Sequence, residues 1–306
     1  MHQLWTWVFE PGLFSSQPVR VAAIIGGVVA VVSAVTGVFT VMRGQSFGGH
    51  ALGDVSAAGG SGALLAGLNP LAGFVGLGIA GAGVMDMIGV RRVRSKDLAT
   101  GIVLGAAIGL SALFLYLEAV SGATTGAPAQ ILFGSIFTVS PSTIPSVVAL
   151  GAIALAGIAI VWRPLLLTTV STDIAAARGV RVRLTGLVFM LALAVSVGLS
   201  SLAVGAILST ALLIGPAAAA LRVTKTLPRA LVTACLTGVA ATWLGILLAY
   251  DSYYWGSGHQ ILPVSFFIVA IIFATYLVAR LPAARAARRR AAAPATGAAD
   301  MDQVAA

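Results

Sequence analysis

Long apolar stretches alternate along the chain with shorter polar segments that hold most of its arginines. A helix needs roughly 20 apolar residues to cross the hydrocarbon core of a bilayer. Nine stretches of about this length are present, and they predict an all-α, polytopic integral membrane protein. The predicted spans are residues 19–42, 48–68, 70–90, 98–119, 143–162, 183–201, 203–221, 230–250 and 261–280.

Two of these spans, 48–68 and 203–221, are short and rich in glycine. Irregular backbone at membrane depth is tolerated where it is buried in protein or lines a water-filled cavity. Either span is therefore a candidate for a broken or re-entrant segment. We expect about 8–9 transmembrane helices, with the lower count if one of these two spans does not cross.

The composition agrees with this fold class, because 59% of the residues are hydrophobic and only 9% are charged. The mean hydropathy of +1.03 exceeds what a soluble domain tolerates. The net charge of +9 comes from arginines between the apolar spans and not from one basic domain, so we expect no nucleic-acid partner. With the N-terminus outside and the C-terminus cytoplasmic, 17 of the 18 lysines and arginines lie on the inner side, leaving only Arg20 outside.

The predicted transmembrane domain, residues 19–280, is flanked by two segments of different character. Residues 1–18 hold several aromatic residues and a glutamate, which predicts an interfacial segment resting on the membrane surface. Residues 281–306 are rich in alanine and arginine and then polar, which predicts a cytoplasmic helix extension followed by disorder. We expect the arginines of this tail to contact anionic membrane lipid.

One stretch of the second span places an imidazole and a carboxylate among small residues. It reads FGGHALGDVSAAGGSG over residues 47–62, and its His50 and Asp54 are four residues apart. On a helix this spacing puts both side chains on one face. The neighbouring glycines and alanines allow other helices to come close, so both side chains project between helices. Our hypothesis is that this pair lies on the path of a transported metal ion. The alternative is a local hydrogen-bonded pair that holds a broken helix together.

Other acidic residues at membrane depth are few. Ionisable groups there are costly, and they usually line a cavity or pair with a partner. Of the nine acids, only Asp54 and Asp86 fall inside the predicted spans, and Glu118 ends its span at the outer boundary. Asp86 lies five residues before Arg91. It is either a group on the ion pathway or a partner of the inner arginines, and both interpretations are open.

Two connecting segments carry the signals of short helices. The inner segment 163–183 contains TVSTDIAAARGVRV, in which a Ser/Thr/Asp cluster precedes alanines and Gly179. A capping cluster before and a glycine after predict a short surface helix at about Thr172 to Arg178. The outer segment 121–142 holds ILFGSIFTVS between two prolines, which predicts a short helix lying in or dipping into the outer interface.

Glycines at helical spacing predict close contact between spans. Gly101, Gly105 and Gly109 recur at intervals of four and form a smooth groove for another helix. The span 70–90 is also dense in glycine, and this density suits either flexibility or close approach.

Several stretches resemble one family in their order and spacing. They are GGHALGDVSAAGG, KDLATGIVLGAAIGLSALFLYL, ILFGSIFTVS, STDIAAARGV and AVGAILSTALLIGPAAAALRV. Over about residues 21–280, the chain resembles the metal-ion branch of ATP-binding-cassette importer permeases.

The resemblance implies a function and a set of partners. It implies a multi-pass permease in the plasma membrane of a prokaryote, acting as a homodimer with a cytoplasmic ATPase and an extracellular metal-binding receptor. The transported ion would be divalent manganese, zinc or iron, and no cofactor would be bound permanently. The chain contains no P-loop motif, so we expect a transport subunit and not an enzyme, with ATP hydrolysis in a separate polypeptide.

The first of these stretches departs from the family pattern in one respect. The family usually reads Gly-Asp-Ala-Leu-Ser-His, with the acid first, whereas here His50 precedes Asp54. The four-residue spacing is kept, so one nitrogen and one carboxylate oxygen remain on the same helical face. Such a mixed donor set suits Mn(II), Fe(II) or Zn(II).

The resemblance also assigns the short inner helix to the ATPase. In such permeases this helix docks in a groove of the ATPase, and the matching residues here are Asp173, Ala176, Ala177, Arg178 and Gly179. The alanines allow close seating, Asp173 is expected to cap the helix, and Arg178 is expected to meet an acidic rim.

Two other functions stay open. A permease for metal chelates, of the siderophore or cobalamin type, would lack a paired histidine and aspartate on one face. A secondary metal transporter would show internal repeats and several charged residues within the spans, whereas we find two acids and no clear repeat.

Overall fold

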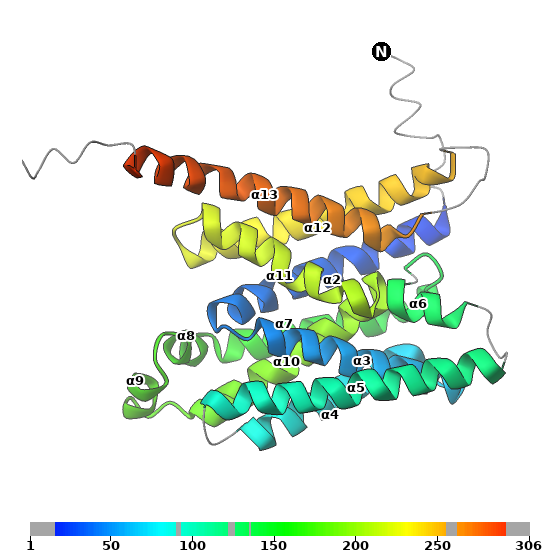
Figure 1. The fold of residues 1–306 in the computed structure, drawn as a ribbon, viewed down its shortest axis with the longest axis horizontal. Helices are drawn as coiled ribbons and strands as arrows, with labels where there is room; N and C mark the ends of the chain where they lie inside the picture. The colour runs from blue at the N-terminus through cyan, green and yellow to red at the C-terminus, as the bar shows by residue number, and fades with distance from the viewer. Residues whose placement is uncertain (1–15, 90–92, 122–125, 135, 255–261, 292–306) are drawn as a thin grey trace, which may run out of the picture.

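The structure is a computed structural model that describes residues 16–89, 93–121, 126–134, 136–254 and 262–291. Residues 1–15 of the predicted interfacial segment and the end of the tail lie outside these residues. Every regular element in the described part is a helix, which confirms the all-α fold class (Figure 1). The elements are α2 (Gln17–Met42), α3 (Ser46–Leu65), α4 (Pro70–Gly89), α5 (Val93–Ser121), α6 (Ala127–Phe133), η2 (Pro141–Thr143), α7 (Ile144–Ile160), α8 (Trp162–Val170), α9 (Thr172–Ala177), α10 (Val182–Val204), α11 (Ala206–Val223), α12 (Leu227–Asp251), η3 (Ser252–Tyr254) and α13 (Val264–Ala291).

Each predicted span corresponds to a helix, and the two candidates for a broken segment are both continuous. α3 is unbroken over 20 residues, and α11 is unbroken although Pro216 lies inside it. The interpretation of α3 as a broken helix is therefore wrong. Within the described residues, eight helices are long and apolar enough to cross a membrane, and α3 is not among them. His50, Asp54 and the many glycines of α3 account for its lower hydropathy.

The long helices run side by side, so the bundle has two ends (Figure 1). α8 and α9 lie at one end, which we call the α9 end, and α6 lies at the other, the α6 end. α2 begins at the α6 end, whereas α13 finishes at the α9 end. Because the described chain begins at one end of the bundle and finishes at the other, an odd number of helices must run from end to end. The eight apolar helices together with α3 give this odd number.

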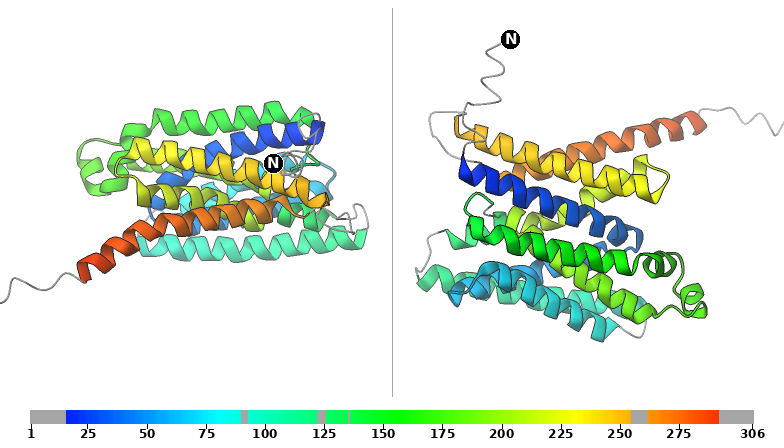
Figure 2. Two further views of the ribbon diagram at one scale, coloured as in Figure 1. Left: turned by 90° about the horizontal axis from the view of Figure 1, so that it is seen from above. Right: turned by 180° about the vertical axis from the view of Figure 1, so that it is seen from behind.

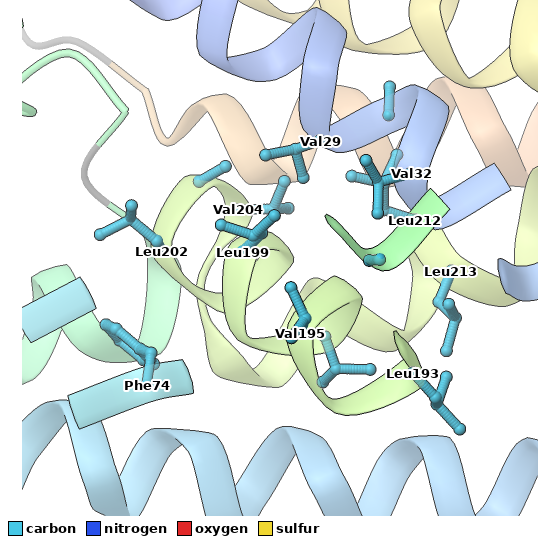
Figure 3. Close-up of a cluster of buried hydrophobic side chains, with 14 of the residues drawn as sticks. Val29, Val32, Phe74, Leu193, Val195, Leu199, Leu202, Val204, Leu212 and Leu213 are labelled. Atoms are coloured by element: carbon cyan, nitrogen blue, oxygen red, sulfur yellow. The ribbon is translucent and has the colours of Figure 1, made fainter. Parts of the chain in front are cut away.

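α2 and α10 form the centre of the bundle. In their most apolar stretches 67% and 78% of the residues are buried, against 11% in α5. Figure 3 shows Leu199 of α10 among side chains from α2, α4 and α11, such as Val32, Phe74 and Leu212. Burial on all sides explains why α2 and α10 are apolar around their whole circumference.

Buried hydroxyl groups join the two central helices. Ser33 Oγ lies 2.7 Å from Ser200 Oγ, and Thr36 Oγ1 lies 2.8 Å from Ser196 Oγ. Thr36 also donates to the carbonyl of Val32 in the preceding turn. In membrane proteins such interhelical hydrogen bonds contribute about 0.6 kcal/mol each to stability. Because all four side chains are buried, these bonds connect α2 and α10 without exposing polar atoms to lipid.

The outer helices include α5, α7, α12 and α13. α2 lies between α7 and α12, as the view from behind in Figure 2 shows. On α5, a Cβ built at Gly101, Gly105 or Gly109 would meet no atom within 4 Å in the described part of the chain. The predicted groove is therefore present, and none of the described helices fills it.

The end of α6 lies against the junction between α10 and α11. Gly134 and Gly205 both have positive φ, +84° and +91°, and an added Cβ at Gly205 would collide with the carbonyl oxygen of Leu132. Because only glycine allows this approach, the short helix predicted for residues 121–142 is held against the bundle through backbone contact.

Close approach, and not flexibility, explains most glycines of α4. Gly59 of α3 and Gly73 of α4 face each other so closely that a Cβ on either would collide with the carbonyl oxygen of the other. Added Cβ atoms at Gly78 and Gly81 would also be too close to side chains of α3, at 2.7 and 2.6 Å, whereas Gly76 and Gly83 have open space around them. The α3–α4 contact is thus a backbone-to-backbone contact that needs glycine on both sides.

We predict that Gly59→Ala and Gly73→Ala each lower the thermal stability of the purified protein. The added methyl group must push the two backbones apart, and overpacking of this kind costs about 1–3 kcal/mol. Gly76→Ala, on the same helix as Gly73, should not lower the unfolding midpoint, because the site is open and alanine is the better helix former. Equal midpoints for all three variants, measured in detergent by fluorescence-detected unfolding, would contradict this account of the contact.

Candidate functional site

His50 and Asp54 lie on one face of α3, in its second and third turns. Their facing atoms, His50 Nε2 and Asp54 Oδ2, are 3.8 Å apart. The His50 side chain is 46% exposed and that of Asp54 is 21% exposed. The helical spacing therefore brings the two groups together at a position that this chain leaves partly open.

The separation of the pair is informative about its chemistry. A distance of 3.8 Å is too long for a hydrogen bond, which excludes the local hydrogen-bonded pair considered from the sequence. Nitrogen and carboxylate ligands lie about 2.0–2.2 Å from an ion such as Zn²⁺. Two atoms 3.8 Å apart are within reach of one shared ion.

A third group, Thr210 of α11, contacts the histidine and was missed by the sequence reasoning. His50 Nδ1 is 3.1 Å from Thr210 Oγ1. On the other side of the pair, Ser111 of α5 donates to the backbone carbonyl of Asp54 at 3.4 Å. The one available signal for Thr210 was its position in AILSTALLIGP, where Ser209 and Thr210 are polar within an apolar run.

The depth of the pair follows from the course of α3. The helix begins at Ser46, directly after the end of α2, and Arg43 at that end contacts α8. His50 and Asp54 lie about 6 and 12 Å along the axis from this beginning, at 1.5 Å per residue. The pair is therefore in the half of the bundle nearer the α9 end.

The pair supplies only two donors. Among the described residues there is no group of three or more His, Cys, Asp or Glu side chains that could hold a metal ion. A stable metal site usually has four or more ligands. The arrangement therefore suits transient contact with an ion, with further ligands from water, hydroxyl groups or another chain.

The structure also shows the surroundings of Asp86 and Glu118, the other two acids within or at the end of a predicted span. Asp86 Oδ2 is 3.9 Å from Arg183 Nε at the beginning of α10, which supports pairing with an inner arginine. Arg91, the partner suggested by the sequence, lies outside the described residues. Glu118 lies three residues before the end of α5, near the helix end where it was expected, and its side chain is only 1% exposed.

The predicted short inner helix is present as α9. Ser171 is its N-cap, and the Ser171 hydroxyl accepts a hydrogen bond from the backbone N–H of Ile174 at 3.3 Å. Asp173 lies in the first turn, where its negative charge interacts favourably with the helix dipole. It was expected to be the N-cap, but Ser171 occupies that position. Arg178 follows the helix, and Gly179 has a φ of +78° that ends it. Ala176, Ala177 and Arg178 are exposed, so this surface is accessible.

A partly buried arginine joins α8 to the bundle. The guanidinium of Arg43, at the end of α2, donates to Thr168 at 2.9 Å and to Thr169 at 3.4 Å. It also lies 5.2 Å from the ring centroid of Phe189 on α10, a cation–π distance. Arg43 was counted from the sequence only as a positive charge, but it connects α2, α8 and α10.

We predict that Asp86→Asn and Arg183→Gln change stability little. The pair is long at 3.9 Å and Arg183 is 73% exposed, so the interaction resembles surface ion pairs worth about 0–1 kcal/mol. A double-mutant cycle on the unfolding midpoint measures the coupling. A coupling of several kcal/mol would show that the pair is a structural element of the bundle, against this prediction.

Comparison with known proteins gives a consistent assignment. Residues 15–275 match the model of the ABC 3 transport family. The manganese import system permease protein ScaB of Streptococcus gordonii is 28% identical over 265 residues, which cover 87% of this chain and 94% of that protein. The high-affinity zinc uptake system membrane protein ZnuB of Haemophilus influenzae is 25% identical over 253 residues, covering 82% of this chain and 94% of ZnuB.

The fold comparison agrees with the sequence comparison. The solved structure of PsaBC from Streptococcus pneumoniae in complex with Fab superposes with a TM-score of 0.74 at 25% identity, covering 88% of this chain and 93% of that chain. With bacterial relatives of this kind and eight helices able to cross a membrane, the chain is a multi-pass protein of a prokaryotic plasma membrane. Since the family model matches most of its length, the chain belongs to the ABC 3 transport family.

Proposed function

We propose that this chain is the permease subunit of an ATP-driven importer of divalent transition-metal ions. The observation that carries the proposal is the pair of His50 and Asp54, whose facing atoms are 3.8 Å apart on an otherwise small-residue helix. An intramembrane ionisable pair is costly and is expected to serve transport. The names of the relatives, which include manganese and zinc permeases, point to the same class of cargo.

The donor set limits the cargo to a group of metals. One imidazole nitrogen and one carboxylate oxygen suit Mn(II), Fe(II) and Zn(II), and the order of affinities alone does not select among them. Exchange of the two donors relative to the family pattern leaves the same two atoms on the same face of α3. The proposal therefore concerns the class of ion and includes no resident cofactor.

The arginines favour one orientation in the membrane. Cytoplasmic loops carry an excess of lysine and arginine. Among the described lysines and arginines, Arg20 alone lies at the α6 end, near the beginning of α2. We infer that the α9 end faces the cytoplasm, since the following described residues lie at or near it: Arg43, Arg163, Arg178, Arg181, Arg183, Arg222, Lys225 and Arg229.

This orientation gives the pair a late position on the inward path. An ion from an extracellular receptor would enter near α6 and would reach Asp54 and His50 in the cytoplasmic half. A two-donor site binds weakly enough to release the ion inward, as conduction requires.

The α9 surface is the proposed docking site for the ATPase. Its small, exposed alanines allow close seating, and Asp173 and Arg178 supply charges at its two ends. Movement of α9 would be transmitted to the bundle because α10 follows it and Arg43 joins α8 to α2. In this way nucleotide-driven closure of the ATPases would produce alternating access.

A second copy of this chain is the proposed partner of the open face. The glycines of α5 at positions 101, 105 and 109 face open space, and His50 is half-exposed beside α5 and α11. A homodimer would cover this face and enclose the path of the ion. A permease for metal chelates is the alternative, and uptake of free metal against chelated metal separates these two functions. Membership of the ABC 3 transport family excludes a secondary transporter.

We predict that His50→Ala and Asp54→Ala each abolish metal uptake without preventing assembly. Each change removes one of two donors, while both side chains are partly exposed and contribute little packing. The measurement is cellular accumulation of Mn, Zn and Fe, together with recovery of the complex. The exchanged double variant, His50→Asp with Asp54→His, keeps both donors and should transport better than either single variant. Normal accumulation in the two alanine variants would overturn the proposed function.

We predict that Gly179→Pro and Asp173→Arg weaken association with the ATPase. Proline cannot adopt the φ of +78° found at Gly179, and arginine at position 173 opposes the helix dipole. Gly67→Pro is the matched control, because Gly67 also has a positive φ of +69° but follows the C-terminal end of α3, away from α9. Copurification measures the association, and undiminished recovery of the ATPase with both α9 variants would exclude the docking role.

A further inference from the structure

The two nitrogens of the His50 ring have different partners. Nδ1 is 3.1 Å from the hydroxyl oxygen of Thr210, whereas Nε2 is directed to the Asp54 carboxylate at 3.8 Å. The first distance is a hydrogen bond and the second is not. One nitrogen is thus occupied by a second helix, and the other is left for the space beside Asp54.

This division has a chemical consequence for the imidazole. A neutral imidazole carries one N–H and one lone pair, and only the nitrogen with the lone pair binds a metal. When Nδ1–H donates to the Thr210 oxygen, the lone pair is on Nε2, next to Asp54 Oδ2. The hydroxyl then fixes both the tautomer and the rotation of the ring, as carboxylate or carbonyl partners do for metal-binding histidines.

The position of Thr210 is set by the packing of α3 on α11. Gly53 lies against Ser209, where an added Cβ would be 3.2 Å from the hydroxyl oxygen. One turn earlier, Gly49 lies against Leu213, where an added Cβ would be 2.9 Å from a methyl carbon. These two contacts fix the antiparallel register of the helices. Thr210, next to Ser209, therefore comes to lie opposite His50.

We propose that Thr210 is a positioning residue for the metal pair. It acts through His50, holding Nε2 towards Asp54 so that the two donors share one ion. This inference rests on the proposed role of His50 and Asp54 in metal transport. It adds α11 to the site, so that the affinity for the ion depends on the contact between α3 and α11.

The test is direct Mn²⁺ binding to the purified permease–ATPase complex in lipid nanodiscs, without the receptor. Free Mn²⁺ from manganese chloride is followed by its electron paramagnetic resonance signal, and His50→Ala is measured alongside. Thr210→Val keeps the shape of the side chain but removes the hydroxyl, and we expect the Kd for Mn²⁺ to rise on the order of 10- to 100-fold. Thr210→Ser keeps the hydroxyl and should restore a Kd close to that of the unmodified complex.

Thr237→Val is the matched control. The hydroxyl of Thr237 on α12 donates to the carbonyl of Thr233 in its own helix, at 2.7 Å, so its loss should leave Mn²⁺ binding unchanged. Thr210→Ala, which cannot overpack, provides the same test if Thr210→Val is not recovered. A normal Kd in the hydroxyl-free variants, with binding lost in His50→Ala, would overturn the role of Thr210 alone. Normal binding and uptake in His50→Ala would overturn the proposed function itself.

Discussion

The close approach of α3 to its neighbours is the constraint on which the site depends. α3 contacts α4 through Gly59 and Gly73 and lies against α11 through Gly49 and Gly53. Without side chains at these positions, the α3 backbone packs directly on the backbone of α4 and on the side chains of Ser209 and Leu213 of α11, so the helix keeps one register against both neighbours. That register is what carries His50 and Asp54 into the bundle on a helix less apolar than the other long ones. A polar pair at this depth is tolerated because α3 packs against other helices on most of its surface, and a second copy of the chain is proposed to cover the side on which His50 is exposed.

Much of the fold was predictable because apolar length is a strong signal in a membrane protein. Each of the long helices, the short α9 and its stop at Gly179 follow from runs of apolar residues, a capping serine and a glycine. The expected break in α3 was wrong, since glycine in lipid-shielded contacts serves packing and does not interrupt the helix. The burial of the Glu118 side chain was not predicted, because the place of a residue near a helix end does not show which helices pack beside it.

The site was predictable only as far as one helix extends. A spacing of four places His50 beside Asp54 whatever the surroundings, so the pair could be found from the sequence. Thr210 and Arg43 act across helices, at sequence separations of 160 and 125 residues from their partners. Their roles depend on interhelical register, which periodicity does not encode. Asp86 shows the same limit, since its partner Arg183 comes from a helix that follows much later in the chain.

The geometry of α10 has a mechanical consequence. It is one continuous helix of 23 residues, with α9 just before its beginning and Gly205 at its end. Hydroxyl pairs from Ser196 and Ser200 join it to α2 nearer the Gly205 end than the α9 end. A rigid rod held at such a point is a lever with a long arm and a short arm. If closure of the ATPases tilts α10 about this point, Gly205 moves less than the α9 end and in the opposite direction, and it lies where the end of α6 is in backbone contact and where α11, with Thr210, begins.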